Sequence, residues 1–262
     1  MTIFQAIILG IVQGLTELLP ISSSAHLFLI PWLLNWNIPD SFSVALHAGT
    51  LLAIGIFFFK DWLNLLKGAY KATIKREPNR DGTMFWYIVM ATIPGGIIGF
   101  ILDKFFSDIL TKPLIIGCMF VIMGILFYVV DKKGANDTKY ENMTFKQTFL
   151  IGLSQALAFI PGVSRSGITI TSARALGVER EAAARYSFML SASIVLAATI
   201  YKFKDFVFNL PFVIGVIASF VVGILVIKFL LEYLKKGSFK GFAIYRVILG
   251  IAVIILWATI LH

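Results

Sequence analysis

The sequence predicts an all-α polytopic membrane protein. We expect a single integral-membrane domain, residues 1–262, built from two inverted-topology repeats with six transmembrane spans and two re-entrant helical hairpins. Three observations predict this architecture: apolar residues dominate the chain, its two halves resemble each other, and its basic residues gather in alternate connections.

The composition excludes an ordinary soluble protein. Hydrophobic residues make up 58% of the 262 and charged residues only 14%, whereas soluble domains carry about 25% charged residues. The N-terminal stretch has no Lys or Arg before its apolar run and no clear cleavage site, so we expect it to stay in the mature protein. Stretches that approach or exceed the roughly 20 residues needed to cross a bilayer are residues 2–36, 42–59, 84–102, 113–130, 145–176, 186–201, 210–231 and 242–261.

The net charge of +9 does not indicate a nucleic-acid partner. The basic residues lie in short connections between apolar stretches, where the positive-inside rule accounts for them. The single cysteine, Cys118, lies within an apolar stretch, which excludes an intramolecular disulfide and a cysteine metal cluster. Residues 62–75 form a basic amphipathic stretch that we expect on the cytoplasmic surface.

A duplication relates the two halves. The opening stretch "LGIVQGLTELLPISSSAH" (residues 9–26) aligns without a gap with "IGLSQALAFIPGVSRSGI" (residues 151–168) at an offset of 142, and Gly, Gln, Leu and two Ser residues coincide. An offset of 144 extends the similarity through the apolar stretch at residues 42–61, which ends in the same Lys-Asp pair. We therefore predict repeat 1 at about 1–133 and repeat 2 at about 145–262.

Each repeat begins with an apolar stretch that a Pro-, Ser- and Gly-rich segment interrupts, "LPISSSA" in the first and "IPGVSRSG" in the second. Irregular backbone at membrane depth is tolerated only where it is buried in protein or lines a watery cavity. Broken helices in inverted repeats often meet at a site near the midplane. We therefore expect both stretches to enter and leave on the same side as re-entrant hairpins.

The distribution of basic residues favours this arrangement. With six spans, sixteen lysines and arginines fall on one side and four on the other, whereas eight spans would give twelve and eight. The positive-inside rule then assigns the larger group to the cytoplasm and both termini to the outside. The sixteen lie in the connections 60–80, 132–146, 174–185 and 235–240.

Glu17 is the one acidic residue deep inside an apolar stretch, and Arg165 is a cation in the second interrupted segment. A buried ionisable group in a membrane is a functional hypothesis by default. The two could form a purely structural ion pair, or the anion that Arg165 needs could be partly a substrate's. An arginine fork suits phosphate, and nearby hydroxyls can bind phosphate oxygens: Ser164, Ser166 and Thr169.

The first interrupted segment adds oxygen ligands and a candidate nucleophile. Gln13 and Glu17 share one helix face, and with serine oxygens they could hold a hard divalent cation, Mg²⁺ or Ca²⁺. His47, in an apolar span, is interpreted as a packing residue. The candidates for substrate binding, nucleophilic attack and proton transfer are Ser22, Ser23, Ser24 and His26.

These residues resemble a known family, the integral-membrane undecaprenyl-diphosphate phosphatases, also called bacitracin-resistance proteins. The resemblance covers essentially the whole chain and rests on "QGLTE" (13–17) followed by "LPISSSAH", and on the more specific "PGVSRSGIT" (161–169). The segment "FAIYR" (242–246) is also similar. The first motif begins with Gln, a variant that the family's pattern allows, so a bound metal would have one carboxylate fewer.

The resemblance implies hydrolysis of the terminal phosphate of a C55 polyprenyl diphosphate, which regenerates the lipid carrier for peptidoglycan synthesis and confers bacitracin resistance. It implies a multi-pass protein of the bacterial plasma (inner) membrane, with an active site that opens to the outer face. It also makes a divalent cation at Glu17 and Gln13 the expected cofactor. The expected partners are the polyprenyl diphosphate substrate and membrane lipids, while the oligomeric state, including a homodimer, stays open.

For the attack on phosphorus we favour Ser23, with His26 as proton carrier and Arg165 neutralising charge. Attack by His26 or by a metal-activated water stays open. A different class of function is an alternating-access transporter or flippase of a polyprenyl phosphate lipid, because such carriers use inverted repeats. At the offset of 142, however, Glu17 meets Phe159 and His26 meets Ile168, so one composite site fits better than two equivalent ones.

Overall fold

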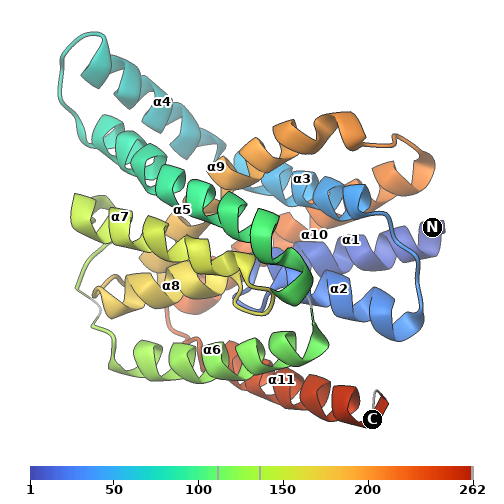
Figure 1. The fold of residues 1–262 in the computed structure, drawn as a ribbon. Coiled ribbons are helices and arrows are strands. Elements are labelled where there is room, and N and C mark those ends of the chain that lie inside the picture. The colour runs from blue at the N-terminus through green and yellow to red at the C-terminus, as the bar shows by residue number, and fades with distance from the viewer. Residues whose placement is uncertain (111, 136, 261–262) are drawn as a thin grey trace.

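The computed structural model describes residues 1–110, 112–135 and 137–260, and this part of the chain is helical without a β-strand (Figure 1). Leu261, the last residue of the predicted final span, lies outside the described residues. The elements are α1 (Ile3–Leu18), α2 (Ser23–Leu34), α3 (Asp40–Phe57), α4 (Phe59–Thr73), α5 (Arg80–Leu110), α6 (Pro113–Lys133), η1 (Tyr140–Asn142), α7 (Phe145–Ser154), η2 (Gln155–Phe159), α8 (Arg165–Ala175), α9 (Arg180–Lys202), η3 (Phe203–Asp205), α10 (Leu210–Leu234) and α11 (Lys240–Ile260).

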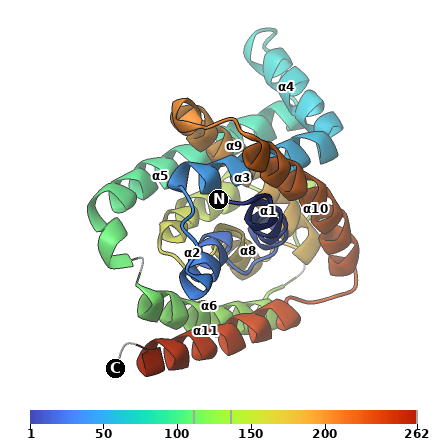
Figure 2. The same cartoon turned by 90° about the vertical axis from the view of Figure 1, so that its right-hand side faces the viewer.

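Five helices of the described part are long and apolar enough to cross a bilayer, and the bent pair α3–α4 raises the number to six. The helices α1 and α2 are apolar but shorter. The predicted span at 42–59 ends at a bend of 75°, after which the predicted surface stretch forms α4 and projects from the bundle (Figures 1 and 2). The chain is therefore a multi-pass membrane protein.

The connections separate into two groups at opposite ends of the bundle (Figure 1). The start of α1, the end of α11, the end of α5, the start of α6 and the connections α2–α3 and α9–α10 lie at one end, which we call the terminal end. The connections α4–α5, α6–α7, α8–α9 and α10–α11 lie at the other, which we call the basic end. The four connections predicted to share one side of the membrane thus share the basic end.

A single buried carboxylate ties much of the basic end together. Asp131, near the end of α6, is 4% exposed. Its Oδ1 accepts hydrogen bonds from Arg174 Nε at 3.0 Å and Arg180 Nε at 2.8 Å, and its Oδ2 accepts the backbone N–H of Phe239 at 3.1 Å. The end of α6, the turn between α8 and α9, and the connection α10–α11 therefore meet at one point.

The two halves begin with the same local structure. In α1, the N–H of Gln5 donates to Thr2 Oγ1 and the N–H of Thr2 donates to Gln5 Oε1. In α7, Gln147 and Thr144 form the same reciprocal pair, 142 residues later. Such a capping box satisfies backbone donors at a helix start, so the matched polar residues of the two halves serve the same purpose.

Both interrupted segments also break in the same way. We call residues 19–22, between α1 and α2, the first break, and residues 160–164, between η2 and α8, the second break. The residue before α2, Ser22, has φ 71°, and the residue before α8, Ser164, has φ 72°. The helix α1 runs from the terminal end to the middle of the bundle and α2 returns, whereas α7 enters from the basic end and α8 returns (Figure 1). Figure 2 shows α1, α2 and α8 inside a ring that includes α5, α6, α9 and α10, so the irregular backbone is covered by protein.

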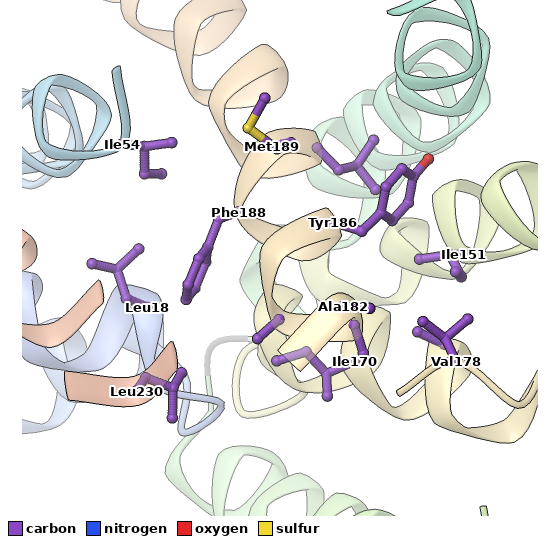
Figure 3. Packing of buried hydrophobic residues seen from close by; sticks show 14 of the residues in the cluster. Leu18, Ile54, Ile151, Ile170, Val178, Ala182, Tyr186, Phe188, Met189 and Leu230 are labelled. Carbon is purple, nitrogen blue, oxygen red and sulfur yellow. The ribbon is translucent and has the colours of Figure 1, made fainter. Parts of the chain in front are cut away.

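Close helix contacts anchor the interior segments. A Cβ atom at Gly10 of α1 would lie 2.4 Å from the carbonyl oxygen of Gly215 on α10, and one at Gly152 of α7 would lie 2.4 Å from that of Ala91 on α5. Small residues allow such approach between membrane helices. The end of α1 is further fixed by Leu18, which is fully buried in the core shown in Figure 3.

Candidate active site

The two breaks meet at a cavity of about 260 Å³ in the interior of the bundle. The end of α1, the start of α2, the start of α8 and parts of α3 and α9 form its walls. Its polar lining contains most of the predicted site residues, while α3, η2 and α9 contribute an apolar wall. The polar lining consists of Thr16, Glu17, Ser22, Ser23, Ser24, His47, Gln155, Ser164, Arg165, Ser166 and Thr199.

Glu17 is the centre of the polar cluster. Its Oε1 accepts a hydrogen bond from Arg165 Nη2, which joins the two halves of the chain in an ion pair. Its Oε2 accepts the Ser23 hydroxyl at 2.5 Å and Gln13 Nε2 at 3.2 Å, and His47 Nε2 lies 3.4 Å from the same oxygen. The side chain of Glu17 is 4% exposed and that of Arg165 is 18% exposed, so solvent screens this pair weakly.

The serines of the second break lock it against the first. Ser166 Oγ donates to the carbonyl oxygens of Glu17 at 3.2 Å and Leu19 at 3.1 Å. Ser164 Oγ accepts the N–H of Gly167 at 3.1 Å and thereby caps α8. Both hydroxyls line the cavity, so they combine a structural bond with access to a ligand.

The remaining predicted hydroxyls divide into two groups. Ser22 Oγ accepts the N–H of Gly162 at 3.3 Å and lies 3.3 Å from Ser24 Oγ, and both serines line the cavity. Thr169 lies one turn deeper in α8, where its hydroxyl donates to the carbonyl oxygen of Arg165 at 2.7 Å, and it is not among the cavity residues. Thr169 therefore supports the Arg165 backbone in this structure.

The contacts of His26 and His47 differ from those that the sequence led us to expect. His26 Nδ1 lies 2.7 Å from the carbonyl oxygen of Ser22 and its Nε2 lies 2.7 Å from the Tyr245 hydroxyl, so both nitrogens have partners, and His26 is not among the residues that line the cavity. A carbonyl only accepts, so Nδ1 carries the proton and the neutral ring accepts from Tyr245. The structure places His47, expected only to pack, next to Glu17, and among the described residues no hydrogen bond joins His26 to Ser23.

Glu17 and Gln13 carry oxygen atoms of the kind that a divalent cation binds, and in this structure both carboxylate oxygens of Glu17 accept hydrogen bonds from protein groups. Gln13 is fully buried and its Oε1 has no hydrogen-bond partner among the described residues, so this oxygen is available for another ligand. Mg²⁺ is often bound by one or two carboxylates together with substrate phosphates. The described part of the chain contains no cluster of three or more His, Cys, Asp or Glu side chains able to hold a metal, so Glu17 and Gln13 alone could supply only part of a coordination shell.

Fold and site together define an integral-membrane protein with a buried carboxylate, guanidinium and hydroxyl cluster at two helix breaks. The chain belongs to the family described as bacitracin resistance protein BacA, whose model matches residues 6–252. The resemblance seen in the sequence motifs is thereby confirmed.

Relatives named undecaprenyl-diphosphatase match along the whole chain. The one from Pelotomaculum thermopropionicum is 47% identical over 99% of this chain and 98% of its own length. Those from Desulforudis audaxviator and Moorella thermoacetica are 47% and 43% identical, each over 97% of both chains. The similarity therefore includes both breaks and the cavity between them.

Proposed function

We propose that this chain hydrolyses undecaprenyl diphosphate to undecaprenyl phosphate and inorganic phosphate, and so recycles the lipid carrier of cell-envelope synthesis. The name shared by its relatives states this activity. The single observation that carries the assignment is the meeting of Glu17, Ser23 and Arg165 in one cavity.

The cavity suits a lipid diphosphate because its wall is divided between polar and apolar residues. Glu17, the serines and Arg165 form a polar region, and an arginine fork with hydroxyl donors matches phosphate oxygens. Side chains from α3, η2 and α9 form the apolar wall, namely Val44, Ala158, Phe159, Ile194, Val195 and Ala198. A diphosphate can occupy the polar region while the prenyl chain follows the apolar wall towards the bilayer.

The geometry supports Ser23 as the attacking group and Glu17 as its base. The hydroxyl of Ser23 attacks the terminal phosphorus while its proton passes to Glu17 Oε2, the hydrogen-bond acceptor at 2.5 Å. The bond from phosphorus to the bridging oxygen breaks, and undecaprenyl phosphate leaves with that oxygen. Water then hydrolyses the phosphoserine, which releases phosphate and restores the serine hydroxyl.

Arg165 stabilises the charge that develops on the phosphoryl oxygens. Its Nη2 donates to Glu17, and its other guanidinium N–H groups, which have no hydrogen-bond partner among the described residues, can donate to a phosphate. His47, next to Glu17, is placed to exchange a proton with that carboxylate. Glu17 and Gln13 would hold a divalent cation, Mg²⁺ or Ca²⁺, which would supply charge neutralisation to the diphosphate.

We further propose that the chain is one domain of two inverted repeats, about 1–133 and 145–262, with α1–α2 and α7–α8 as re-entrant hairpins. The matched capping boxes and the matched positive φ angles of Ser22 and Ser164 support the duplication. The opposite directions from which the two hairpins enter support the inversion (Figure 1). The two breaks differ, because Glu17 lies beside the first and Arg165 beside the second. This asymmetry favours an enzyme with one catalytic site over a carrier with two equivalent substrate sites.

The orientation that we propose places the basic end in the cytoplasm of a bacterial plasma (inner) membrane and the terminal end outside. The positive-inside rule supports this assignment. The cavity involves Val44 and His47 in the first half of α3 and Ala198 and Thr199 in the last third of α9. Both segments lie towards the terminal end (Figure 1), which supports an active site that opens to the outer face.

Phosphate release from undecaprenyl diphosphate by the purified protein in detergent tests the proposal. We expect release by the wild-type chain, its loss with a chelator and its return with added Mg²⁺ or Ca²⁺. The same measurement on Arg165→Ala should give almost no release. If folded wild-type protein released no phosphate with either ion, the proposed hydrolysis would be wrong. If a chelator did not change phosphate release, only the proposed cation would be wrong.

A further inference from the structure

A second arginine lies between the two breaks, and it has no carboxylate partner in the described part of the chain. Arg246, on α11, is fully buried, and no acidic side chain of the described residues pairs with it. Its guanidinium instead donates to three backbone carbonyl oxygens, of Pro20 at 3.0 Å, of Gly162 at 2.6 Å and of Val163 at 2.9 Å. One side chain therefore bonds the first break and the second break at once.

These three carbonyl groups belong to the irregular backbone that the interrupted helices leave behind. Buried carbonyl groups need hydrogen-bond partners, and water is scarce at this depth. Arg246 supplies the partners from a third segment of the chain. Burying a guanidinium without an anion is costly in a membrane, and a neutral residue of similar size would avoid that cost, so the contact needs a reason beyond packing.

The position of Arg246 gives that reason. Pro20 precedes the proposed nucleophile Ser23 by three residues, and Gly162 and Val163 closely precede Arg165. We propose that Arg246 is a positioning residue, which sets the distance between the Ser23 and Glu17 half of the active site and the Arg165 half. This inference rests on the proposed hydrolysis and deepens it.

Two neighbouring features are consistent with this positioning role for α11. A Cβ atom at Gly167 would lie 2.7 Å from Arg246 Nη1, so the absence of a side chain there leaves room for the guanidinium. The preceding residue, Tyr245, bonds His26 at 2.7 Å and stacks on its ring with an interplanar angle of 8°. Consecutive residues of α11 thus hold α2 and both breaks, and His26 belongs to this support.

Arg174 provides a matched control. It is also fully buried, but it lies at the basic end, where it bonds Asp131 and the carbonyl oxygens of Gly134, Ala135 and Val178. Losing a buried arginine should therefore destabilise either variant, whereas only the loss of Arg246 should disturb the relative position of the breaks.

The experiment compares Arg246→Lys, Arg246→Met and Arg174→Lys as full-length proteins in detergent. We expect kcat for phosphate release to fall about 10- to 100-fold in Arg246→Met, because displacing a reacting group by about 1 Å can cost that much, while KM stays within about threefold. Lysine restores one cationic donor but not the fork, so Arg246→Lys should recover part of kcat. Arg174→Lys should keep the wild-type kcat per folded molecule.

Hydrogen–deuterium exchange gives a second measurement that does not depend on activity. We expect faster exchange at residues 19–26 and 160–168 together in the Arg246 variants and unchanged exchange there in Arg174→Lys. Wild-type kcat with unchanged exchange in Arg246→Met would overturn the proposal, as would an equal kcat loss in Arg174→Lys. If Arg246→Met does not fold, Arg246→Lys decides by the same two measurements. If the wild-type protein had no phosphatase activity, the proposed hydrolysis would be refuted. The exchange data would still decide whether Arg246 holds the two breaks in position.

Discussion

Replacing Ser23 by alanine separates a nucleophile from a hydrogen-bond donor, because its neighbours provide internal controls. Ser23 is the serine whose hydroxyl donates to Glu17, at 2.5 Å. Ser22 Oγ accepts a backbone N–H of the second break at 3.3 Å, and Ser24 is exposed with its Oγ 3.3 Å from that of Ser22. The three alanine variants therefore remove three different kinds of contact.

The expected losses differ enough to be told apart. A hydrogen bond to a charged group contributes about 1.5–3 kcal/mol, so a Ser23 that only donates to Glu17 would cost about 13- to 160-fold in rate. A Ser23 that attacks phosphorus should cost about 10⁴-fold or more, as the loss of a nucleophile does in other enzymes. Ser22→Ala, which removes a neutral hydrogen bond, should cost about 2- to 13-fold, and Ser24→Ala less.

Single-turnover phosphate release, with enzyme in excess over undecaprenyl diphosphate, measures the chemical step without product release. Binding of the lipid should persist in Ser23→Ala, because Arg165 and the neighbouring serine hydroxyls of the cavity remain to hold the headgroup. A trapped phosphoserine in the wild-type protein, absent from Ser23→Ala, would add direct evidence. A Ser23→Ala rate within about 160-fold of wild type, the limit for one charged hydrogen bond, would remove Ser23 as nucleophile and leave water or a histidine.

Three further predictions concern the arginine, the topology and the packing. Arg165→Lys should recover less than about one tenth of the wild-type rate, because an ammonium group cannot reproduce the two-point contact of the guanidinium; near wild-type phosphate release by this variant would contradict its role. Single cysteines at Lys67 and Lys236, in a chain without the native cysteine, should both resist an impermeant thiol reagent in intact cells, and labelling of either would refute the cytoplasmic basic end. Gly10→Ala should lower the melting temperature, since overpacking costs about 1–3 kcal/mol and its Cβ would lie 2.4 Å from a backbone oxygen of α10; Gly55→Ala, with open space around it, should not, and equal melting temperatures would contradict this account.

Composition and charge predicted the spans well because burial in lipid constrains every residue of a long helix. The six predicted spans correspond to α3, α5, α6, α9, α10 and α11, and the four basic connections lie at one end. The meeting of Glu17 with Arg165, one of two alternatives that the sequence left open, also follows from energetics, because a charge buried in a membrane protein is costly unless an opposite charge or several polar groups satisfy it.

The histidines could not be assigned in the same way. His26 lies in the motif next to Ser23, so proximity along the chain favoured it as proton carrier, whereas α2 turns its ring towards Tyr245, more than two hundred residues away in the sequence. His47 reaches Glu17 only because α3 packs beside the first break. Contacts between residues of different helices depend on helix rotation and packing, which the spacing of residues along one helix does not contain. The role of Arg246 was hidden for the same reason.

The positive φ angles of Ser22 and Ser164, the residues before α2 and α8, set the thermal stability of the protein against its catalytic rate. A positive φ at a residue other than glycine costs on the order of 1 kcal/mol, and Ser22 and Ser164 both accept it. Selection of this protein for heat resistance alone should therefore favour Ser164→Gly, because glycine in place of serine at a helix N-cap costs only about a few tenths of a kcal/mol. This change would relieve backbone strain yet remove a hydroxyl from the cavity, so a variant with a higher melting temperature should release phosphate more slowly. The natural chain, on this account, keeps a strained serine where a more stable protein would carry glycine.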